Sequence, residues 1–476
     1  MFPFPFPWPS PAIATLVTVF SVLLAILVTI DVLLKKSDVP RALGWIGAVW
    51  LSPLLGSLLY YLFGINRVTR RALRLTRLDA TQSRDCEPAT LDAAPHIMQL
   101  SAISRDITQS PLSGGNALTI LEDGDQTYPE MLAAIQGAQR SIALSSYIFR
   151  NDSAGQEFAD ALIAATRRGV KVRVLLDSIG IGYLCPRIYY RLRREGVAAA
   201  RFLHTWLPWR MPFLNMRNHR KLLAVDGRVG FLGGINIGDE NCARAVKGRT
   251  KDVHFRVAGP AVRTVMDAFA RDWAFTTGEI LNDEDWWPNL EAQGTVFARG
   301  IRCGPDADIY KLEMLLGAAI TLAQRRIRIV TPYFLPDPRL QFAIHQAGLR
   351  GVAVEIVIPT RGDQRVMDWA MRGHLRFFRY IRAAIVATPP PFDHAKLCTV
   401  DGEWSLIGSS NWDARSFRLN FEFDLELIGR DMTAQIDALI DARIAGGKAL
   451  TPDMLAAEPV WIRLRNAAAR LLMPYL

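Results

Sequence analysis

The chain has 476 residues, of which 50% are hydrophobic and 21% charged, and its formal net charge is +10. This length allows two or three domains, or one large duplicated domain with additions, and the positive charge favours an anionic partner such as nucleic acid, a phosphate ester or an anionic lipid. The 5 cysteines are scattered without C-x-x-C spacing, which argues against a disulfide framework and against a zinc site.

Two long apolar runs open the chain. Residues 1–30 carry no charged side chain, and a second uncharged run covers 42–66. Each exceeds the roughly 20 residues that cross a bilayer as a helix. We therefore expect a transmembrane hairpin over residues 1–66, with helices at about 11–34 and 42–64. A cleaved signal peptide is a weaker alternative, because the first run is too long and lacks a basic leading segment. Buried core helices are a further alternative.

Basic residues are distributed unequally around these runs. The turn of the expected hairpin contains Lys35, Lys36 and Arg41, whereas five arginines follow the second run, at 67, 70, 71, 74 and 77. Cytoplasmic flanks carry the excess of Lys and Arg in membrane proteins. We therefore expect a multi-pass protein whose main domain lies in the cytoplasm. Residues 67–115 are less periodic and contain several prolines, so we interpret them as a linker.

From residue 116 onward the sequence repeats itself. The segment 140–149 resembles 326–334, and each copy is followed by a helical pattern and a second apolar strand. In the first copy the periodicity predicts strands at 142–148 and 170–176 around a helix at 156–167. Alternating strands and helices are typical of an α/β fold with a largely parallel sheet. We expect a duplicated α/β fold with a first half over 116–300 and a second over 301–476.

The most informative feature is a motif, H-x-K-x4-D, that occurs once in each half. Its copies lie within 213–240 and 388–415, and each has a G-[GS]-x-N tail at the same offset from its histidine. A single copy would be weak evidence, but two copies inside a wider repeat predict one shared site. The candidate catalytic residues are His219, Lys221, Asp226, His394, Lys396 and Asp401.

These residue types suit attack on a phosphodiester. A neutral imidazole can attack phosphorus, and an imidazolium can protonate the leaving alkoxide, so two histidines can divide the two tasks. On a strand each lysine shares the face of its histidine, which brings two ammonium groups to the phosphate. The tails add hydrogen-bonding groups as candidate phosphate ligands: Asn236, Ser409 and Asn411.

Other features of the sequence are less specific. The remaining histidines lack such a context, and we interpret them as ordinary core or surface residues. Asp, Glu and His do not cluster at ligand spacings and no nucleotide-binding G-x-x-x-x-G-K-[ST] loop occurs, so we expect neither a metal nor another cofactor. The aromatic run 206–213 is either a core loop or a loop that enters the lipid interface. The C-terminal segment 460–476 is either an amphipathic helix against lipid or a helix that closes the domain.

Taken together, the motifs and the hairpin identify a family. The chain resembles the phospholipase D superfamily and, within it, bacterial cardiolipin synthases of the membrane-hairpin type. Further matching stretches include Thr331-Pro-Tyr-Phe334 and Gly408-Ser-Ser-Asn-Trp-Asp-Ala-Arg-Ser416. The resemblance implies a phosphohistidine intermediate, no metal, and a location in the bacterial inner membrane. It implies that Asp252 and Glu422 orient the histidines and that the motif aspartates support the fold.

The expected reaction transfers a phosphatidyl group between two phosphatidylglycerol molecules and gives cardiolipin and glycerol. We expect His219 to be the nucleophile and His394 the acid/base. The expected partners are therefore phospholipids and not nucleic acid; the sequence does not indicate an oligomeric state. Close alternatives are a lipid hydrolase and a synthase that uses phosphatidylethanolamine as donor. A nuclease of the same superfamily and an inactive membrane scaffold are more distant ones.

Overall fold

The computed structural model of the chain describes residues 11–36, 39–64, 91–205, 216–245, 248–305, 308–380, 382–471 and 473, without the side chains of residues 62, 63, 379 and 380. The chain forms two compact units, a small N-terminal one and a large one that holds both H-x-K-x4-D motifs. The aromatic run 206–213 lies outside the described residues.

The N-terminal unit contains α1 (Pro11–Lys35), α2 (Val39–Leu51), α3 (Pro53–Leu59) and a π-helical turn, η1 (Tyr60–Gly64). Among the described residues, α1 alone is long and apolar enough to cross a membrane. Its 25 residues extend about 38 Å, whereas the 13 residues of α2 extend only about 20 Å, less than the roughly 30 Å of a hydrocarbon core.

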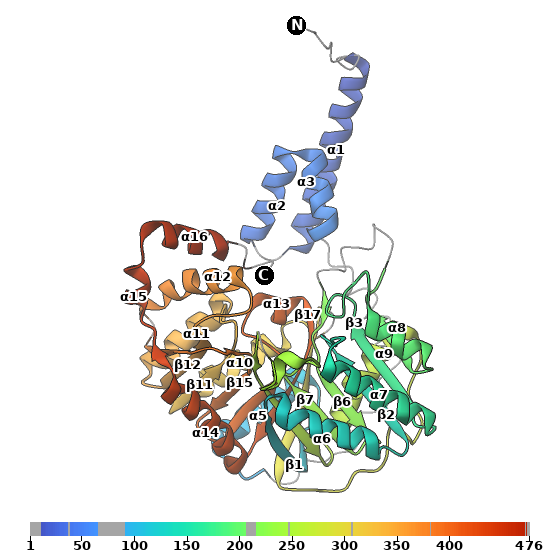
Figure 1. The fold of residues 1–476 in the computed structure, drawn as a ribbon. Helices are drawn as coiled ribbons and strands as arrows, with labels where there is room; N and C mark the ends of the chain where they lie inside the picture. The colour runs from blue at the N-terminus through green and yellow to red at the C-terminus, as the bar shows by residue number, and fades with distance from the viewer. Residues whose placement is uncertain are drawn as a thin grey trace. The chain divides into compact units, whose positions relative to one another are not determined.

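The expected second helix at 42–64 is wrong, because the run breaks at Ser52 and folds back. Ser52 has φ −145° and ψ 83°, outside the helical region. Pro53 causes this, since its ring disfavours helical backbone in the residue before it and it has no N–H to donate. The two short helices then lie side by side against α1 (Figure 1). Gly56 permits this approach, because a Cβ there would lie 2.4 Å from the carbonyl oxygen of Ala48.

Polar contacts bring the end of the second run back to the end of α1. Lys36 Nζ donates to the carbonyl oxygen of Gly64 at 2.5 Å, and the Tyr60 hydroxyl donates to Asp31 at 2.7 Å. Residues 36 and 64 therefore lie at the same level of the N-terminal unit.

The large unit is a duplicated α/β fold, as the sequence predicts. The first half contains the strands β1 (Ser113–Glu122), β2 (Ser141–Ser146), β3 (Lys171–Asp177), β4 (Ala198–Phe202), β5 (Arg217–Asn218), β6 (Leu222–Val225), β7 (Val229–Gly233), β8 (Thr250–Lys251) and β9 (Val253–Ala258). Its helices are α6 (Asp123–Gly137), α7 (Ser153–Arg167), α8 (Arg187–Arg194), α9 (Val262–Thr277) and the 3₁₀ turn η3 (Asp239–Asn241).

The second half repeats this pattern. Its strands are β10 (Val296–Cys303), β11 (Arg326–Val330), β12 (Ala353–Pro359), β13 (Ala383–Thr388), β14 (Phe392–Asp393), β15 (Leu397–Val400), β16 (Trp404–Gly408), β17 (Asn420–Ile428) and β18 (Lys448–Ala449). Its helices are α10 (Lys311–Leu322), α11 (Pro338–Leu349), α12 (Arg365–Leu375), η4 (Arg376–Tyr380), α13 (Ala414–Arg418), α14 (Arg430–Gly446), α15 (Pro452–Ala456) and α16 (Val460–Arg470).

One mixed sheet runs through both halves, in the order β18-β13-β12-β11-β15-β16-β17-β10-β1-β9-β7-β6-β2-β3-β4. The expectation of a largely parallel sheet holds only toward its two ends, where β2, β3 and β4 and their counterparts β11, β12 and β13 pair in parallel. The centre is antiparallel, because hairpins rather than helical crossovers connect β6 to β7 and β15 to β16. The expected boundary at residues 300 and 301 falls inside β10, which joins β1 to β17.

The described end of the expected linker is not a linker. Residues 95–108 form α5, which packs on α10 of the second half. Proline at the first helical position explains its start, since that position needs no N–H donor. Ile97 and Leu100 are fully buried in the core of the second half.

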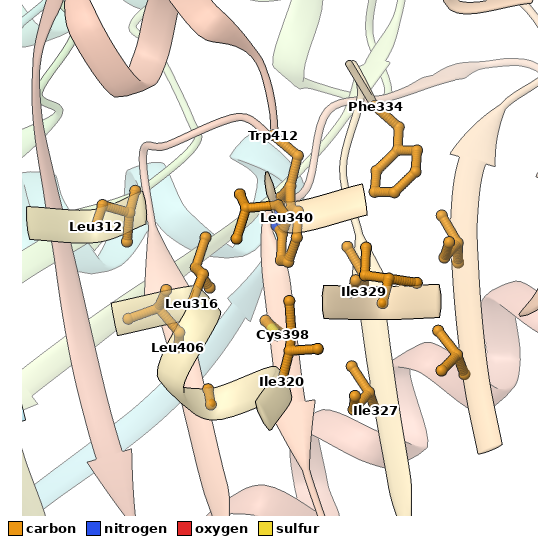
Figure 2. Packing of buried hydrophobic residues seen from close by; sticks show 14 of the residues in the cluster. Leu312, Leu316, Ile320, Ile327, Ile329, Phe334, Leu340, Cys398, Leu406 and Trp412 are labelled. Carbon is orange, nitrogen blue, oxygen red and sulfur yellow. The ribbon is translucent and has the colours of Figure 1, made fainter. Parts of the chain in front are cut away.

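That core lies between the sheet and α10. Figure 2 shows Leu316 and Ile320 of α10 beside Leu406 and Cys398, with Ile327 and Ile329 of β11 further along the same cluster. The rings of Phe334 and Trp412 close the same cluster, with centroids 5.9 Å apart. A matching cluster in the first half places α6 and α7 against β2 and β3. A third combines α9 and α14 with strands of both halves, so the two halves share a core.

The C-terminal segment closes the domain through α16, which packs on α12 (Figure 1). Gly373 of α12 allows a close approach, because a Cβ there would lie 2.4 Å from the carbonyl oxygen of Asn466. The outer face of α16 leaves Trp461 and Leu464 mostly exposed. The helix therefore packs on the domain with one face and keeps an apolar face outward.

Candidate active site

Two short strand pairs bring the motifs together across the halves. β5, which ends just before His219, pairs in parallel with the start of β17. β14, which ends just before His394, pairs in parallel with β8. The backbone N–H of His219 donates to Phe421 O at 2.9 Å, and that of His394 to Lys251 O at 2.7 Å. Each histidine therefore enters the site on a strand that is held by the other half.

This register gives each histidine a carboxylate from the opposite half. His219 Nδ1 lies 3.0 Å from Glu422, and His394 Nδ1 lies 2.7 Å from Asp252. The two imidazole centroids are 6.5 Å apart. At that separation one tetrahedral phosphoryl group can meet both rings, because reacting atoms need to approach to about 3–3.5 Å.

Burial sets the protonation of both rings. It lowers the pKa of His219 to about 4, with Glu422 opposing the shift and Lys221 adding to it. The pKa of His394 is lowered too, first by burial and then by Lys396. Burial would raise the pKa of Glu422, but the charge and hydrogen bond of His219 outweigh it and lower that pKa to about 2. Near neutral pH each ring is neutral, with its proton on Nδ1 and its lone pair on Nε2.

The two motif lysines are buried beside the rings. Lys221 Nζ donates to the carbonyl oxygen of His219 at 2.7 Å, and Lys396 makes the equivalent bond to His394. Burial lowers the pKa of Lys221 to about 7 and that of Lys396 to about 8, against the opposing charges of nearby carboxylates. Because these two ammonium groups are poorly solvated, an anionic ligand beside them strongly stabilises their charged forms.

The motif aspartates do not belong to the site, which corrects their placement among the catalytic candidates. Asp226 and Asp401 lie in the β6–β7 and β15–β16 turns with φ of +51° and +56°. Their carboxylates accept hydrogen bonds from backbone N–H groups at the start of β2 and β11: residues 139, 140 and 141, and residues 324, 325 and 326. They hold the ends of strands together, as the family resemblance implies.

The candidate phosphate ligands differ in their surroundings. Asn236 and Asn411 line the same cavity as the histidines, a space of about 750 Å³. Asn236 accepts from the backbone N–H of Ile148 at 3.1 Å. Asn411 is 6% exposed, and its Oδ1 has no hydrogen-bond partner among the described residues. Ser409 instead donates to Glu422 at 2.6 Å, so it supports the carboxylate that orients His219.

Sequence reasoning missed several groups of this cavity. Tyr147 packs edge-on against His219 with ring centroids 4.8 Å apart, and Lys221 Nζ lies 5.3 Å from the centre of the Tyr147 ring. Arg217 and Arg415 line the cavity as well. The sequence does contain a signal for Arg217: it precedes His219 by two residues, so on a strand the two side chains share one face. Within the described residues no group of three or more His, Cys, Asp or Glu could hold a metal ion.

Comparison with known proteins agrees with this geometry. A family model described as cardiolipin synthase, PLD-like domain, matches residues 131–273 and 316–444. A cardiolipin synthase of Geobacillus kaustophilus is 33% identical over 97% of this chain and 94% of its own length. The chain belongs to the cardiolipin synthase family. Family membership makes it an enzyme, a phosphatidyltransferase, as the sequence predicts.

Other relatives extend the match to both ends of the chain. The major cardiolipin synthase of Bacillus subtilis is 30% identical over 97% of this chain and 99% of its own. A family model described as Phospholipase_D-nuclease N-terminal matches residues 23–64. Among solved structures, phosphatidylserine synthase of Haemophilus influenzae superposes with a TM-score of 0.61 over 79% of this chain and 100% of its own, at 15% identity. That structure shares the fold of the large unit.

Proposed function

We propose that this member of the cardiolipin synthase family transfers a phosphatidyl group from one phosphatidylglycerol to another and releases glycerol. The observation that carries the proposal is that the ring centroids of His219 and His394 lie 6.5 Å apart, and that each ring contacts a carboxylate from the other half. Two imidazoles held in this way can act on opposite sides of one phosphorus atom.

In the first step, Nε2 of His219 attacks the phosphorus of the donor lipid and the bond to the glycerol headgroup breaks. The lowered pKa of His219 supports this role, because it keeps the attacking nitrogen unprotonated. His394 gives a proton to the departing glycerol oxygen; the anionic substrate and Asp252 stabilise the imidazolium that this requires. Lys221 and Lys396 stabilise the charge on the phosphoryl oxygens.

In the second step, His394 takes the proton from a hydroxyl of the acceptor lipid, whose oxygen attacks the phosphohistidine and frees His219. One phosphodiester replaces another, so the exchange is close to thermoneutral and needs no nucleotide. Water competes with the acceptor hydroxyl, and the outcome depends on how well the cavity positions the acceptor.

The membrane unit keeps this site near its substrates. α1 is the spanning helix, and α2 with α3 forms a re-entrant pair that returns to the side of Lys36. All the basic flanks, at 35–41 and after residue 66, then share one side, which the positive-inside rule assigns to the cytoplasm of a bacterial inner membrane. In this proposed arrangement α1 alone spans the membrane, in place of the two-helix hairpin that the sequence predicts.

The purified protein in mixed micelles with phosphatidylglycerol tests the proposal, with products identified by mass spectrometry. We expect cardiolipin and glycerol from the wild type, and no turnover from His219→Ala or His394→Ala. His345→Ala, in α11, serves as the matched control and keeps full activity. Release of phosphatidic acid alone would replace the synthase by a hydrolase; cardiolipin formed only when phosphatidylethanolamine is added would change the donor.

A further inference from the structure

Two arginines from different halves line the reaction cavity beyond the histidines and lysines. Arg217 comes from β5, and Arg415 from α13. Arg217 faces Tyr147, the ring that packs on His219: burial raises the pKa of the Tyr147 hydroxyl, and the charge of Arg217 opposes that effect. The mechanism proposed for one phosphate already uses two lysines, so these arginines are cations that the reacting phosphate does not require.

The internal repeat shows that this pair exists on one side only. Arg217 precedes His219 by two residues, and the residue at that place before His394 is Phe392. Arg415 follows Asn411 by four residues, and the residue at that place after Asn236 is Glu240. All four side chains line the cavity. The repeat therefore places an aromatic ring and a carboxylate at the positions equivalent to the two arginines. The carboxylate, Glu240, pairs with Arg150 at 3.0 Å.

The two arginines lie close enough for their charges to repel each other. Burial lowers the pKa of Arg415, and the charge of Arg217 adds to that effect. The charges of Asp413 and Asp177 oppose this effect on Arg415. Asp177 also accepts three backbone N–H groups, and Asp413 also caps α13 through Ser416 N. Burial also raises the pKa of Asp413 to about 6, which weakens its charge near neutral pH. An anion between the guanidinium groups relieves their repulsion.

Two unpaired amide oxygens lie in the same cavity. Asn420 pairs with Arg217 in the register of β5 and β17, and it is 3% exposed. Its Nδ2 donates to Glu422 at 3.0 Å, whereas its Oδ1 and that of Asn411 have no hydrogen-bond partner in the part of the chain that the structure describes. Such oxygens can accept hydrogen bonds from the hydroxyls of a glycerol headgroup.

We propose that Arg217 and Arg415 form a second phosphate subsite, which holds the phosphodiester of the acceptor lipid while its glycerol hydroxyl attacks. The inference rests on the proposed function and deepens it, because it explains how the cavity favours an anionic lipid over water as acceptor. Asn411 and Asn420 bind the hydroxyls of the headgroup between the two phosphates. Arginine suits this task, since its planar fork binds a phosphodiester through two hydrogen bonds.

A comparison of two acceptors tests the subsite. Labelled glycerol carries no phosphate, and its exchange into phosphatidylglycerol uses the same two chemical steps without the subsite. In Arg217→Gln and Arg415→Gln we expect cardiolipin formation to fall about 10–100-fold, the usual effect of removing a charge-assisted hydrogen bond. Glycerol exchange should change by less than about threefold. Arg105→Gln, on the exposed face of α5, is the matched control for the loss of a positive charge.

The outcomes separate the two proposals. Absence of cardiolipin from the wild type would reject the proposed function. Cardiolipin from the wild type, with glycerol exchange and cardiolipin formation reduced by the same factor in the variants, would overturn the subsite, because the arginines would then serve the fold or the chemistry common to both acceptors. Unchanged cardiolipin formation would overturn it as well. Arg415→Lys, which keeps a charge but not the fork, should give an intermediate loss with cardiolipin alone.

Discussion

The pairing of each histidine with a carboxylate of the other half is the central residue-level feature. Glu422 fixes His219 through Nδ1, and Asp252 fixes His394 in the same way. Both carboxylates are at most 1% exposed, so each is a desolvated charge whose main partner is a ring. Their contribution is to hold the tautomer that presents Nε2 to phosphorus and to stabilise the imidazolium when it forms.

Removal of one of these charges should therefore slow turnover while the other side chains of the site stay in place. In Glu422→Gln the side chain keeps its shape but loses the charge, and we expect kcat to fall about 10²–10⁴-fold, the range of a general acid–base contribution. The measurement is cardiolipin formation at saturating lipid. Asp437→Asn, a buried acid that holds Thr399 and Arg328 in the second half, controls for loss of a buried carboxylate. Equal loss in both variants would assign the effect to stability.

The buried lysines predict a loss of activity at alkaline pH. The pKa of Lys221 is lowered to about 7 and that of Lys396 to about 8, mainly by burial, so both carry charge below these values and lose it above. We expect kcat/KM to fall as pH rises from about 7 to 9. A bound phosphate favours the charged lysines, and the corresponding fall in kcat should therefore appear at higher pH. A flat kcat/KM profile up to pH 9 would show that the lysines remain charged in the free enzyme.

At the scale of elements, the helix α5 lies outside the repeated sequence but belongs to the fold that carries the catalytic residues. Leu100 is fully buried against α10, and Ser104 donates to Glu426 at 2.7 Å. Glu426 in turn pairs with Arg299 of β10 at 2.8 Å. The helix thus stabilises the place where β10 and β17 join the two halves.

We expect Leu100→Ala to lower the free energy of unfolding by about 2–5 kcal/mol, the cost of a cavity in a packed core. Denaturant unfolding of the detergent-solubilised protein, followed by tryptophan fluorescence, measures the change. Met98→Ala in the same helix removes a side chain that is 44% exposed, and its effect should stay below about 1 kcal/mol. Similar values for the two variants would mean that α5 contributes little to the core.

Comparison of elements also shows what the sequence can predict. The apolar runs directly after each H-x-K, at 222–225 and 397–400, coincide with β6 and β15, and they are apolar throughout because these strands are buried on both faces. The acids Asp252 and Glu422 could be named from the family pattern, but not assigned to a histidine, since the cross-half register of β5 with β17 and β8 with β14 involves only two residues in each strand. The hydrophobicity of the second apolar run predicts one continuous helix, but Pro53 interrupts the helical backbone at Ser52.

At the scale of the whole molecule, the N-terminal unit decides on which side of a membrane each end of α1 lies. Lys36 and Gly64 are in contact, so the run 42–64 returns to the level at which it started. If α1 spans the bilayer, the N-terminus and the residues after Gly64 lie on opposite sides. A two-helix hairpin would place them on the same side, with Lys35, Lys36 and Arg41 across the membrane.

The two arrangements predict opposite labelling in spheroplasts that produce the full chain. With the single span, an epitope tag before Met1 is cleaved by external protease, and a cysteine introduced by Lys36→Cys is not modified by a membrane-impermeant maleimide. With the hairpin the tag is protected and the cysteine reacts. Permeabilised cells, in which both positions must become accessible, provide the control. We expect the first pattern because three basic residues at 35–41 then join the arginines after residue 66 on the cytoplasmic side, whereas the hairpin would translocate them.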